Sequence, residues 1–143
     1  MLVHSAHSYI LDPVSVLKSK QIHCDIIVTN PLSAWIEILS ISVNITTQGQ
    51  ALGALQHVFA EPLRIPPNQD ERTKTVCVAL AKFISLALLE AFFEAANTPQ
   101  GAPMHVRGHA QVRVGGAFST VLVLDQGPVP AFVVLRLPPT CEA

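Results

Sequence analysis

The stretch from Val28 to Gly53 reads VTNPLSAWIEILSISVNITTQGQALG. Asn30-Pro31 opens it as a turn, because proline has no N–H for a strand ladder and holds the residue before it in an extended conformation. From Leu39 to Ile45, apolar residues alternate with Ser and Asn, a pattern typical of a half-buried antiparallel strand. Gln48-Gly49 then indicates a turn. We expect this stretch to form a strand corner and the central hairpin of the fold.

The apolar face of this strand changes parity near Ile38-Leu39. Ile36 and Ile38 stand at even positions, whereas the apolar residues from Leu39 to Ile45 stand at odd positions. Side chains of a strand alternate between its faces, so one extra residue moves all later side chains to the other face. The change predicts either a bulge or a strand that passes from one sheet to another.

The rest of the chain adds short strands and one helix. Ser85 is a suitable N-cap, and apolar residues at helical spacing predict a helix over about residues 85–97, which Pro99 and Gly101 end. The expected strands cover residues 2–10, 21–29, 34–47, 52–60, 72–80, 104–114, 118–124 and 131–137, with breaks at Asp12-Pro13, Gly115-Gly116 and Asp125–Pro128.

This order of elements lacks the strand–helix alternation of parallel sheets. It predicts a mainly β fold, an immunoglobulin- or fibronectin-like antiparallel β-sandwich of about seven strands. One α-helix, over about residues 85–97, is inserted before the C-terminal meander. A length of 143 residues fits a single domain spanning residues 1–143.

Composition limits the classes of partner. The net charge is −1 and the basic residues are scattered, which argues against a nucleic-acid surface. Half of the residues are hydrophobic and 13% are charged, which favours either a large core or a surface that meets a protein or lipid. The most membrane-like window, Cys77–Ala96, contains Lys82, Glu90 and Glu94, so we expect no transmembrane segment there.

The cysteines number three, at Cys24, Cys77 and Cys141, and none forms a C-x-x-C pair. No zinc knuckle or redox motif is therefore indicated. Cys24 and Cys77 fall in alternating strand patterns, where a free cysteine behaves as a small core residue. The alternative is a disulfide between Cys24 and Cys77 across the two expected sheets. The sequence leaves both readings open.

Over about residues 20–136, the chain resembles the group-2 late-embryogenesis-abundant (water-stress and hypersensitive-response) domain, and most of all its fungal relatives of unknown function. The resemblance rests on an ordered set of residues: Val28-Thr29-Asn30-Pro31-Leu32-Ser33, Ile38, Ile41, Gly49, Leu52, Gly53, the helix Leu86 to Ala96, Val106-Arg107-Gly108 and the run Val112 to Gly116. Relatives commonly place the domain after a transmembrane helix, and no such helix is seen in this sequence.

The resemblance implies a sandwich with one helix, no enzymatic activity and no cofactor. It also implies a role in stress protection or in holding lipid in a groove between sheet and helix. The place of such a domain would be membrane-associated, vacuolar or extracytoplasmic, as the extramembrane part of an anchored fungal protein.

The residues themselves indicate no catalytic or metal site. His105 and His109 would share a strand face about 13 Å apart, which is too far for one zinc ion. Glu90 and Glu94 are expected on a solvated helix face. An apolar crevice would be lined by Leu88, Leu89, Phe92 and Phe93, and Asn44-Ile45-Thr46 is a glycosylation acceptor sequence at Asn44.

Two functions follow as hypotheses. The first is a non-enzymatic structural or interaction domain with a protein partner, including self-association through edge strands. The alternative is a module that binds lipid or another apolar ligand in a crevice between helix and sheet. No cofactor and no nucleic acid is expected in either case.

Overall fold

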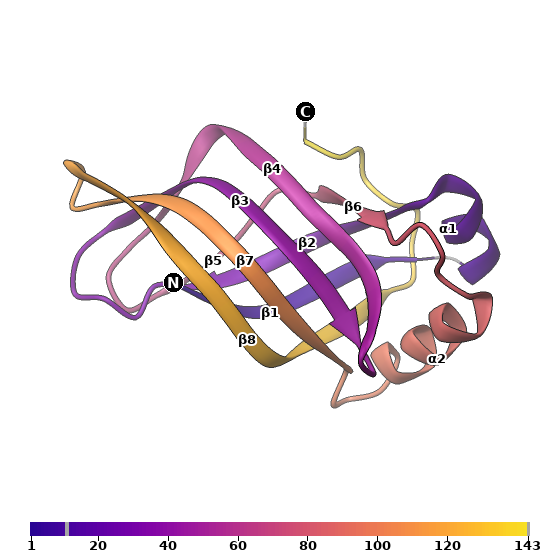
Figure 1. Ribbon diagram of the computed structural model, residues 1–143. Helices are drawn as coiled ribbons and strands as arrows, with labels where there is room; N and C mark the ends of the chain where they lie inside the picture. The colour runs from indigo at the N-terminus through magenta and orange to yellow at the C-terminus, as the bar shows by residue number, and fades with distance from the viewer. Residues whose placement is uncertain (11, 143) are drawn as a thin grey trace.

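The computed structural model describes residues 1–10 and 12–142. Its elements are shown in Figure 1. In chain order they are β1 (Leu2–Tyr9), α1 (Pro13–Ser19), β2 (Gln21–Thr29), β3 (Ile36–Thr47), β4 (Gln50–Ile65), β5 (Asp70–Arg72), β6 (Val76–Leu80), α2 (Leu86–Ala96), β7 (Ala102–Val114) and β8 (Phe118–Val134).

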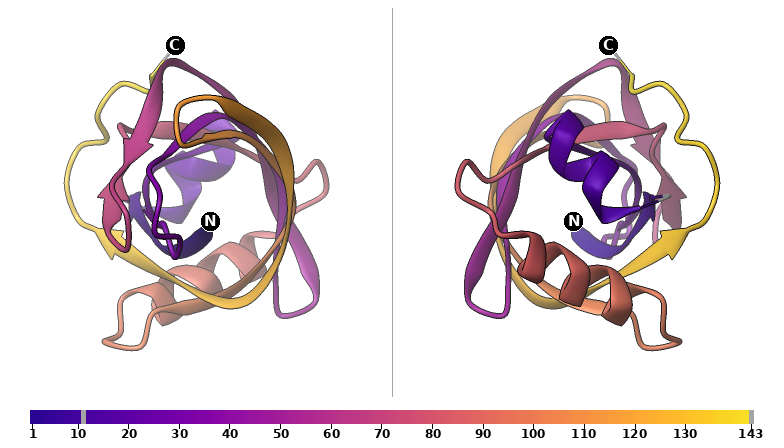
Figure 2. Two further views of the ribbon diagram at one scale, coloured as in Figure 1. Left: turned by 90° about the vertical axis from the view of Figure 1, so that its left-hand side faces the viewer. Right: turned by 90° about the vertical axis from the view of Figure 1, so that its right-hand side faces the viewer.

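Seven of the strands close into a barrel in the order β1-β8-β7-β3-β4-β6-β2, and β2 pairs back to β1. The short strand β5 is added to β2 beyond β6. All pairs are antiparallel except β1 with β8, which run parallel. Views along the barrel show the strands as a ring with α1 and α2 at one end (Figure 2).

The expected β-sandwich is therefore wrong, although the mainly β class is confirmed. A sandwich has two separate sheets with open edges, whereas here the pairs β1–β8 and β4–β6 join the edges into one wall. The alternating pattern of a strand with one buried face is the same in both architectures. What distinguishes them is the pairing of Ala6–Tyr9 with Ala131–Val134, between opposite ends of the chain.

The expected corner at Asn30 is held by its side-chain amide. Asn30 is fully buried, and its Nδ2 donates to the carbonyl oxygens of Ala34, Ile65 and Pro66 at 2.8, 3.1 and 3.1 Å. Its Oδ1 accepts from the N–H of Leu32 at 3.0 Å. The amide thus ties the end of β2 to the end of β4, which is a structural role.

The parity change in β3 is a bulge. Its register shifts between Ile38 and Ser40 against both neighbours, β4 and β7. Ile36 and Ile38 before the shift, and Ile41 and Val43 after it, are all buried in the one core. The bulge therefore keeps the apolar side chains of β3 pointing into the barrel before and after the strand bends.

Local details near the two ends of the chain differ from expectation. The turn expected at Asp125–Pro128 is absent, because β8 continues through it to Val134. The break at Asp12-Pro13 is instead the start of α1, whose first turn is capped by the Asp12 carboxylate accepting from the N–H of Ser15 at 2.8 Å. Asp followed by Pro is a helix-start signal as well as a strand breaker.

The barrel closes narrowly between β4 and β6. These strands pair only at Gly53 with Leu80 and at Ala54 with Ala79. A Cβ on Gly53 would collide with the Ala79 carbonyl oxygen, so glycine permits this close approach. Beyond it the strands separate, and the C-terminal tail lies in the seam, where the N–H of Glu142 donates to the carbonyl of Thr75 at 2.7 Å.

The helix expected over residues 85–97 is α2, capped by the Ser85 hydroxyl, which accepts from the N–H of Leu88 at 3.1 Å. It packs its apolar face against one end of the barrel, where Leu89 is fully buried. Among the described residues, no helix is long and apolar enough to span a membrane.

Candidate functional site

The apolar helix face is part of the core. Leu88, Leu89, Phe92 and Phe93 are all buried. Phe92 closes a cavity of about 40 Å³ inside the barrel, whose other walls are almost entirely aliphatic. Pockets for drug-sized ligands occupy roughly 300–1,000 Å³. The barrel interior is thus largely filled by side chains.

The four residues that we expected to form one crevice do not do so, because they border different spaces. Leu88 borders a groove beside the loop that carries Lys82 and Phe83. Phe93 borders a crevice of about 210 Å³ between α1, α2 and the end of β8. This α1–α2 crevice has apolar walls and polar groups at its rim, and its lining is Ile10, Asp12, Pro13, Phe93, Glu94, Asn97, Val133 and Leu135. Leu89 lines neither space.

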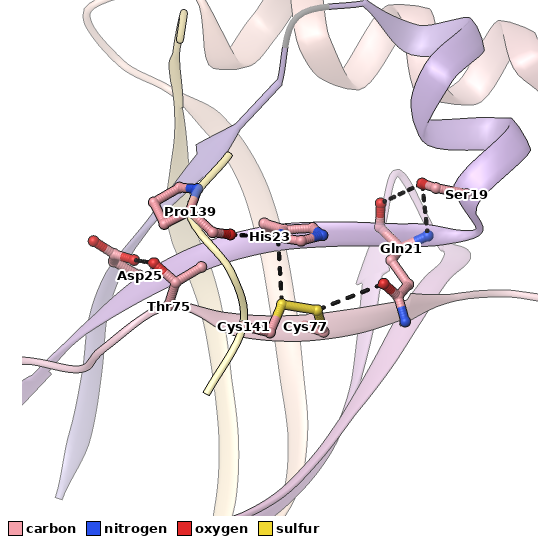
Figure 3. Close-up of a disulfide and its surroundings, with 8 residues drawn as sticks. All are labelled: Ser19, Gln21, His23, Asp25, Thr75, Cys77, Pro139 and Cys141. Carbon is pink, nitrogen blue, oxygen red and sulfur yellow. Dashed lines mark hydrogen bonds between the residues drawn. A yellow bond between two sulfur atoms is a disulfide. The ribbon is translucent and has the colours of Figure 1, made fainter. Parts of the chain in front are cut away.

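The C-terminal tail, residues 135–142, covers the outer face of β2 and β6 (Figure 3). Cys141 forms a disulfide with Cys77 of β6, with the two Cα atoms 5.6 Å apart. His23 of β2 stands opposite Cys77 in the strand register, and its Nδ1 lies 2.8 Å from the carbonyl oxygen of Pro139. The same Nδ1 is 3.4 Å from the sulfur of Cys141.

A disulfide between Cys24 and Cys77 is ruled out by their positions in the wall. Cys24 points into the barrel and lines its cavity, whereas Cys77 points outward to the tail. Neighbouring positions on paired strands face opposite sides, and Cys24 pairs with Val76 rather than with Cys77. Cys24 is a free, buried thiol, and burial raises its pKa to about 12.

Beside the disulfide, Asp25 is the centre of a polar cluster. Its carboxylate accepts from Tyr9 Oη at 2.6 Å, from Thr75 Oγ1 at 2.7 Å and from Arg72 Nε at 2.9 Å. Arg136 of the tail also donates to the hydroxyl of Tyr9 at 3.2 Å. Burial acts to raise the pKa of Asp25, but these hydrogen bonds outweigh it and hold the pKa below its ordinary value. The cluster joins β1, β2, β5 and the tail.

Asp25→Asn is expected to lower the free energy of unfolding by about 1.5–3 kcal/mol at neutral pH, the range for hydrogen bonds to a charged group. Because the folded pKa is below the unfolded value of about 3.9, this stabilisation is present above about pH 4–5 and is lost as pH falls through the folded pKa. Urea unfolding of both proteins across the acid range measures it.

The control is Asp70→Asn, since Asp70 is exposed and accepts one side-chain hydrogen bond from Thr29. We expect a change below about 1 kcal/mol there. A difference between wild type and Asp25→Asn that stays constant down to the lowest pH would contradict the assigned role of the carboxylate.

His57 lies in the seam under the tail. It stacks edge-on against Phe59 with ring centroids 4.7 Å apart, and its Nε2 is buried without a hydrogen-bond partner. The nearest acid is Glu142 of the tail, whose Oε2 is 3.6 Å from that nitrogen. Removal of the tail would therefore expose both an imidazole and an aromatic ring.

Other polar residues singled out in the sequence lie apart from one another. Asn44 is exposed on the outer face of β3, so its acceptor sequence is accessible. His105 pairs with Asp125, and His109 has no ion-pair partner within the described chain. Glu90 and Glu94 occupy the exposed side of α2, as expected. None of these joins a common site.

The first half of β8 has an unpaired edge. From Phe118 to Gln126 it pairs with β7, and the described residues place no strand on its other side, because β1 meets β8 only from Ala131 to Val134. In Figure 1 this part of β8 is one arm of the long hairpin that it forms with β7. An edge of this kind exposes a row of free N–H and C=O groups.

This edge is apolar and lacks the usual protection. Phe118, Val121 and Val123 are 66%, 58% and 84% exposed. Between Phe118 and Leu124 there is no charged residue, no proline and no register shift against β7. Charges, prolines and bulges are the devices that keep natural edge strands from pairing. The sequence contained this signal as the run FSTVLVL, but whether its edge is free depends on which part of β8 pairs with β1.

No protein-family model matches the chain, and curated protein sequences give no match. Among solved structures, the chain is similar to one described as "Crystal structure of protein from Archaeoglobus fulgidus", at 12% identity over 86% of this chain and 91% of that chain, with a TM-score of 0.43. A similarity at this level carries no argument about fold or function.

Proposed function

We propose that the protein is a non-enzymatic interaction domain that binds an extended strand at the free edge of β8. The observation that carries this proposal is the unprotected apolar edge from Phe118 to Leu124. Strand addition at such an edge takes affinity from main-chain hydrogen bonds and specificity from alternate side chains. The rest of the barrel serves as a rigid support, since β7 and β3 are paired on both sides.

A second copy of the same chain is the partner that best fits this edge. In an antiparallel pair centred on Val121, that residue faces its counterpart, Ser119 faces Val123, and Thr120 faces Leu122. The parity of the strand is kept, so exposed side chains meet exposed ones. No charged residue lies within the paired segment, and the two Asp125 carboxylates lie at its opposite ends.

The strength expected for this contact is modest. Pairing of two short edge strands buries less than the roughly 1,200–2,000 Å² of a standard stable interface. We therefore expect a dimer in reversible equilibrium with the monomer. An extended apolar segment of another protein would use the same edge and would compete with the second copy.

The variant Val121→Lys tests this proposal. Since Val121 is exposed in the monomer, the substitution should leave folding intact, while it places two like charges directly opposite each other in the dimer. Sedimentation velocity over a concentration series should show dimers of the wild type and monomers of the variant. The control is Val58→Lys, the same change at a 73% exposed position on β4, which should dimerise like the wild type.

Two results would overturn self-association through β8. One is a wild type that stays monomeric at every concentration. The other is a Val121→Lys variant that dimerises as strongly as Val58→Lys.

A second candidate function, binding of an apolar ligand, is favoured by the α1–α2 crevice. Its walls of Ile10, Phe93 and Val133 suit a short alkyl chain, while its 210 Å³ is too small for a whole lipid. Asp12 and Glu94 at the rim favour an amine head group over a carboxylate.

Titration with octylamine and with octanoate, followed by NMR of the Val133 methyl groups, separates these cases. The proposal expects saturable shifts with octylamine alone. Equal saturable shifts with both compounds would remove the head-group preference, and no shift with either would remove the crevice from consideration.

Kinship with the group-2 late-embryogenesis-abundant domain is likewise a proposal, supported by the residues of the Val28–Gly53 stretch. The membrane-associated or extracytoplasmic location belongs to the same proposal. The disulfide between Cys77 and Cys141 favours an oxidising compartment.

A further inference from the structure

A histidine stands beside the disulfide at the spacing of metal ligands. A ring nitrogen of His23 and the sulfurs of Cys77 and Cys141 all lie within 4.8 Å of one another. Zinc bonds of about 2.3 Å to sulfur and 2.0–2.1 Å to nitrogen, at tetrahedral angles, place such atoms roughly 3.5 Å apart. The observed 3.4 Å between His23 Nδ1 and the sulfur of Cys141 already meets this spacing.

We infer that, when the disulfide is reduced, His23, Cys77 and Cys141 form a binding site for Zn²⁺. A thiol reductant or a phosphine supplies the two electrons that cleave the S–S bond and becomes oxidised in turn. Zn²⁺ then binds both sulfurs as thiolates, and their two protons pass to solvent. The fourth position of the tetrahedron is left to water, as at sites with three protein ligands.

The sheet holds two of the three ligands in place, whether or not the disulfide is formed. His23 and Cys77 are directly opposite each other on the paired strands β2 and β6, so their separation is set by the sheet and does not depend on the disulfide. Cys141 is carried by the tail, which reaches this place through other contacts as well. Those contacts are the hydrogen bonds from Glu142 to Thr75 and from Arg136 to Tyr9. The tail can therefore stay near after reduction.

Metal binding requires one proton to move. In the oxidised form, Nδ1–H of His23 donates to the carbonyl of Pro139 at 2.8 Å. A metal at Nδ1 needs the tautomer with its proton on Nε2, so the Pro139 carbonyl must turn away. All three ligands are half-buried, so the ion can reach them from solvent and the Pro139 carbonyl has room to turn away. Binding of Zn²⁺ therefore requires that the hydrogen bond between His23 and Pro139 is broken and that the disulfide between Cys77 and Cys141 is reduced.

Cobalt(II) titration of the full chain, reduced anaerobically with a phosphine, tests the site. We expect a thiolate-to-cobalt charge-transfer band that saturates at one equivalent and is abolished by Zn²⁺, and no band from the oxidised protein. Loss of an outer-shell partner costs metal sites about 10–100-fold in affinity. The direct-ligand variant His23→Gln should therefore weaken binding by about 100-fold or more.

The controls are His109→Gln, which changes a histidine on β7, and Cys24→Ser, which removes the buried thiol outside the cluster. Both should bind as the wild type does. No band in the reduced protein, or equal affinity of His23→Gln and His109→Gln, would overturn the inference. If reduction unfolds the chain, circular dichroism is used to follow whether Zn²⁺ restores the folded state. Refolding on addition of Zn²⁺ supports the site, and failure to refold rejects it.

Discussion

Phe92→Ala is expected to lower the free energy of unfolding by about 3–5 kcal/mol, the range for removal of a buried phenylalanine. Phe92 is 2% exposed and closes the cavity at the helix end of the barrel. Its loss enlarges a cavity in a rigid strand wall that has little freedom to collapse. Urea unfolding followed by circular dichroism gives the value.

The matched control is Phe83→Ala. Phe83 is 91% exposed in the loop before α2, so the same change should cost less than about 0.5 kcal/mol. If both variants are equally stable, α2 is not part of the core. It would then be a detachable cover over one end of the barrel.

Cys141→Ser is expected to cost about 4 kcal/mol under oxidising conditions. The disulfide joins positions 64 residues apart, and the chain-entropy relation gives this value for a loop of that length. Without the bond, the tail should leave the seam for part of the time. Trypsin should then cleave after Arg136, which is held by its contact with Tyr9 and by the covalent link beyond it.

Thr140→Ser is the control for this variant, because it changes an exposed neighbour in the same tail without touching the bond. Denaturant unfolding and a trypsin time course compare the two proteins. If Cys141→Ser unfolds at the same denaturant concentration as Thr140→Ser and resists trypsin equally, the disulfide does not fasten the tail.

Features that depend on local sequence were predictable. The strand from Gln21 to Thr29, the parity change near Ile38 and the helix capped by Ser85 all follow from patterns within a few residues, although the choice of a bulge over a passage between sheets does not. The closure of the barrel was not predictable, because it depends on a parallel pair between β1 and β8. That pair brings together residues more than a hundred positions apart, and each strand would carry the same alternation in a sandwich.

In the candidate sites, too, the features set by local sequence were predictable and those set by long-range packing were not. Burial of Leu89 and Phe92 followed from helical periodicity, but whether that face meets a crevice or a filled core depends on the packing of the barrel. The disulfide between Cys77 and Cys141 could not be predicted from the sequence. Cys141 lies in a proline-rich tail that has no strand pattern to place it beside β6. The parity of His23 and Cys77 became informative only when β2 was known to pair with β6.

Hydrogen exchange tests most directly whether β8 takes up a strand at its free edge. Within Phe118–Leu124, amides that point away from β7 should exchange rapidly in dilute protein and become protected as the concentration rises. Amides of the same segment that point to β7 should be protected at every concentration. Exchange that does not depend on concentration, with the outward amides always unprotected, would contradict self-association through this edge.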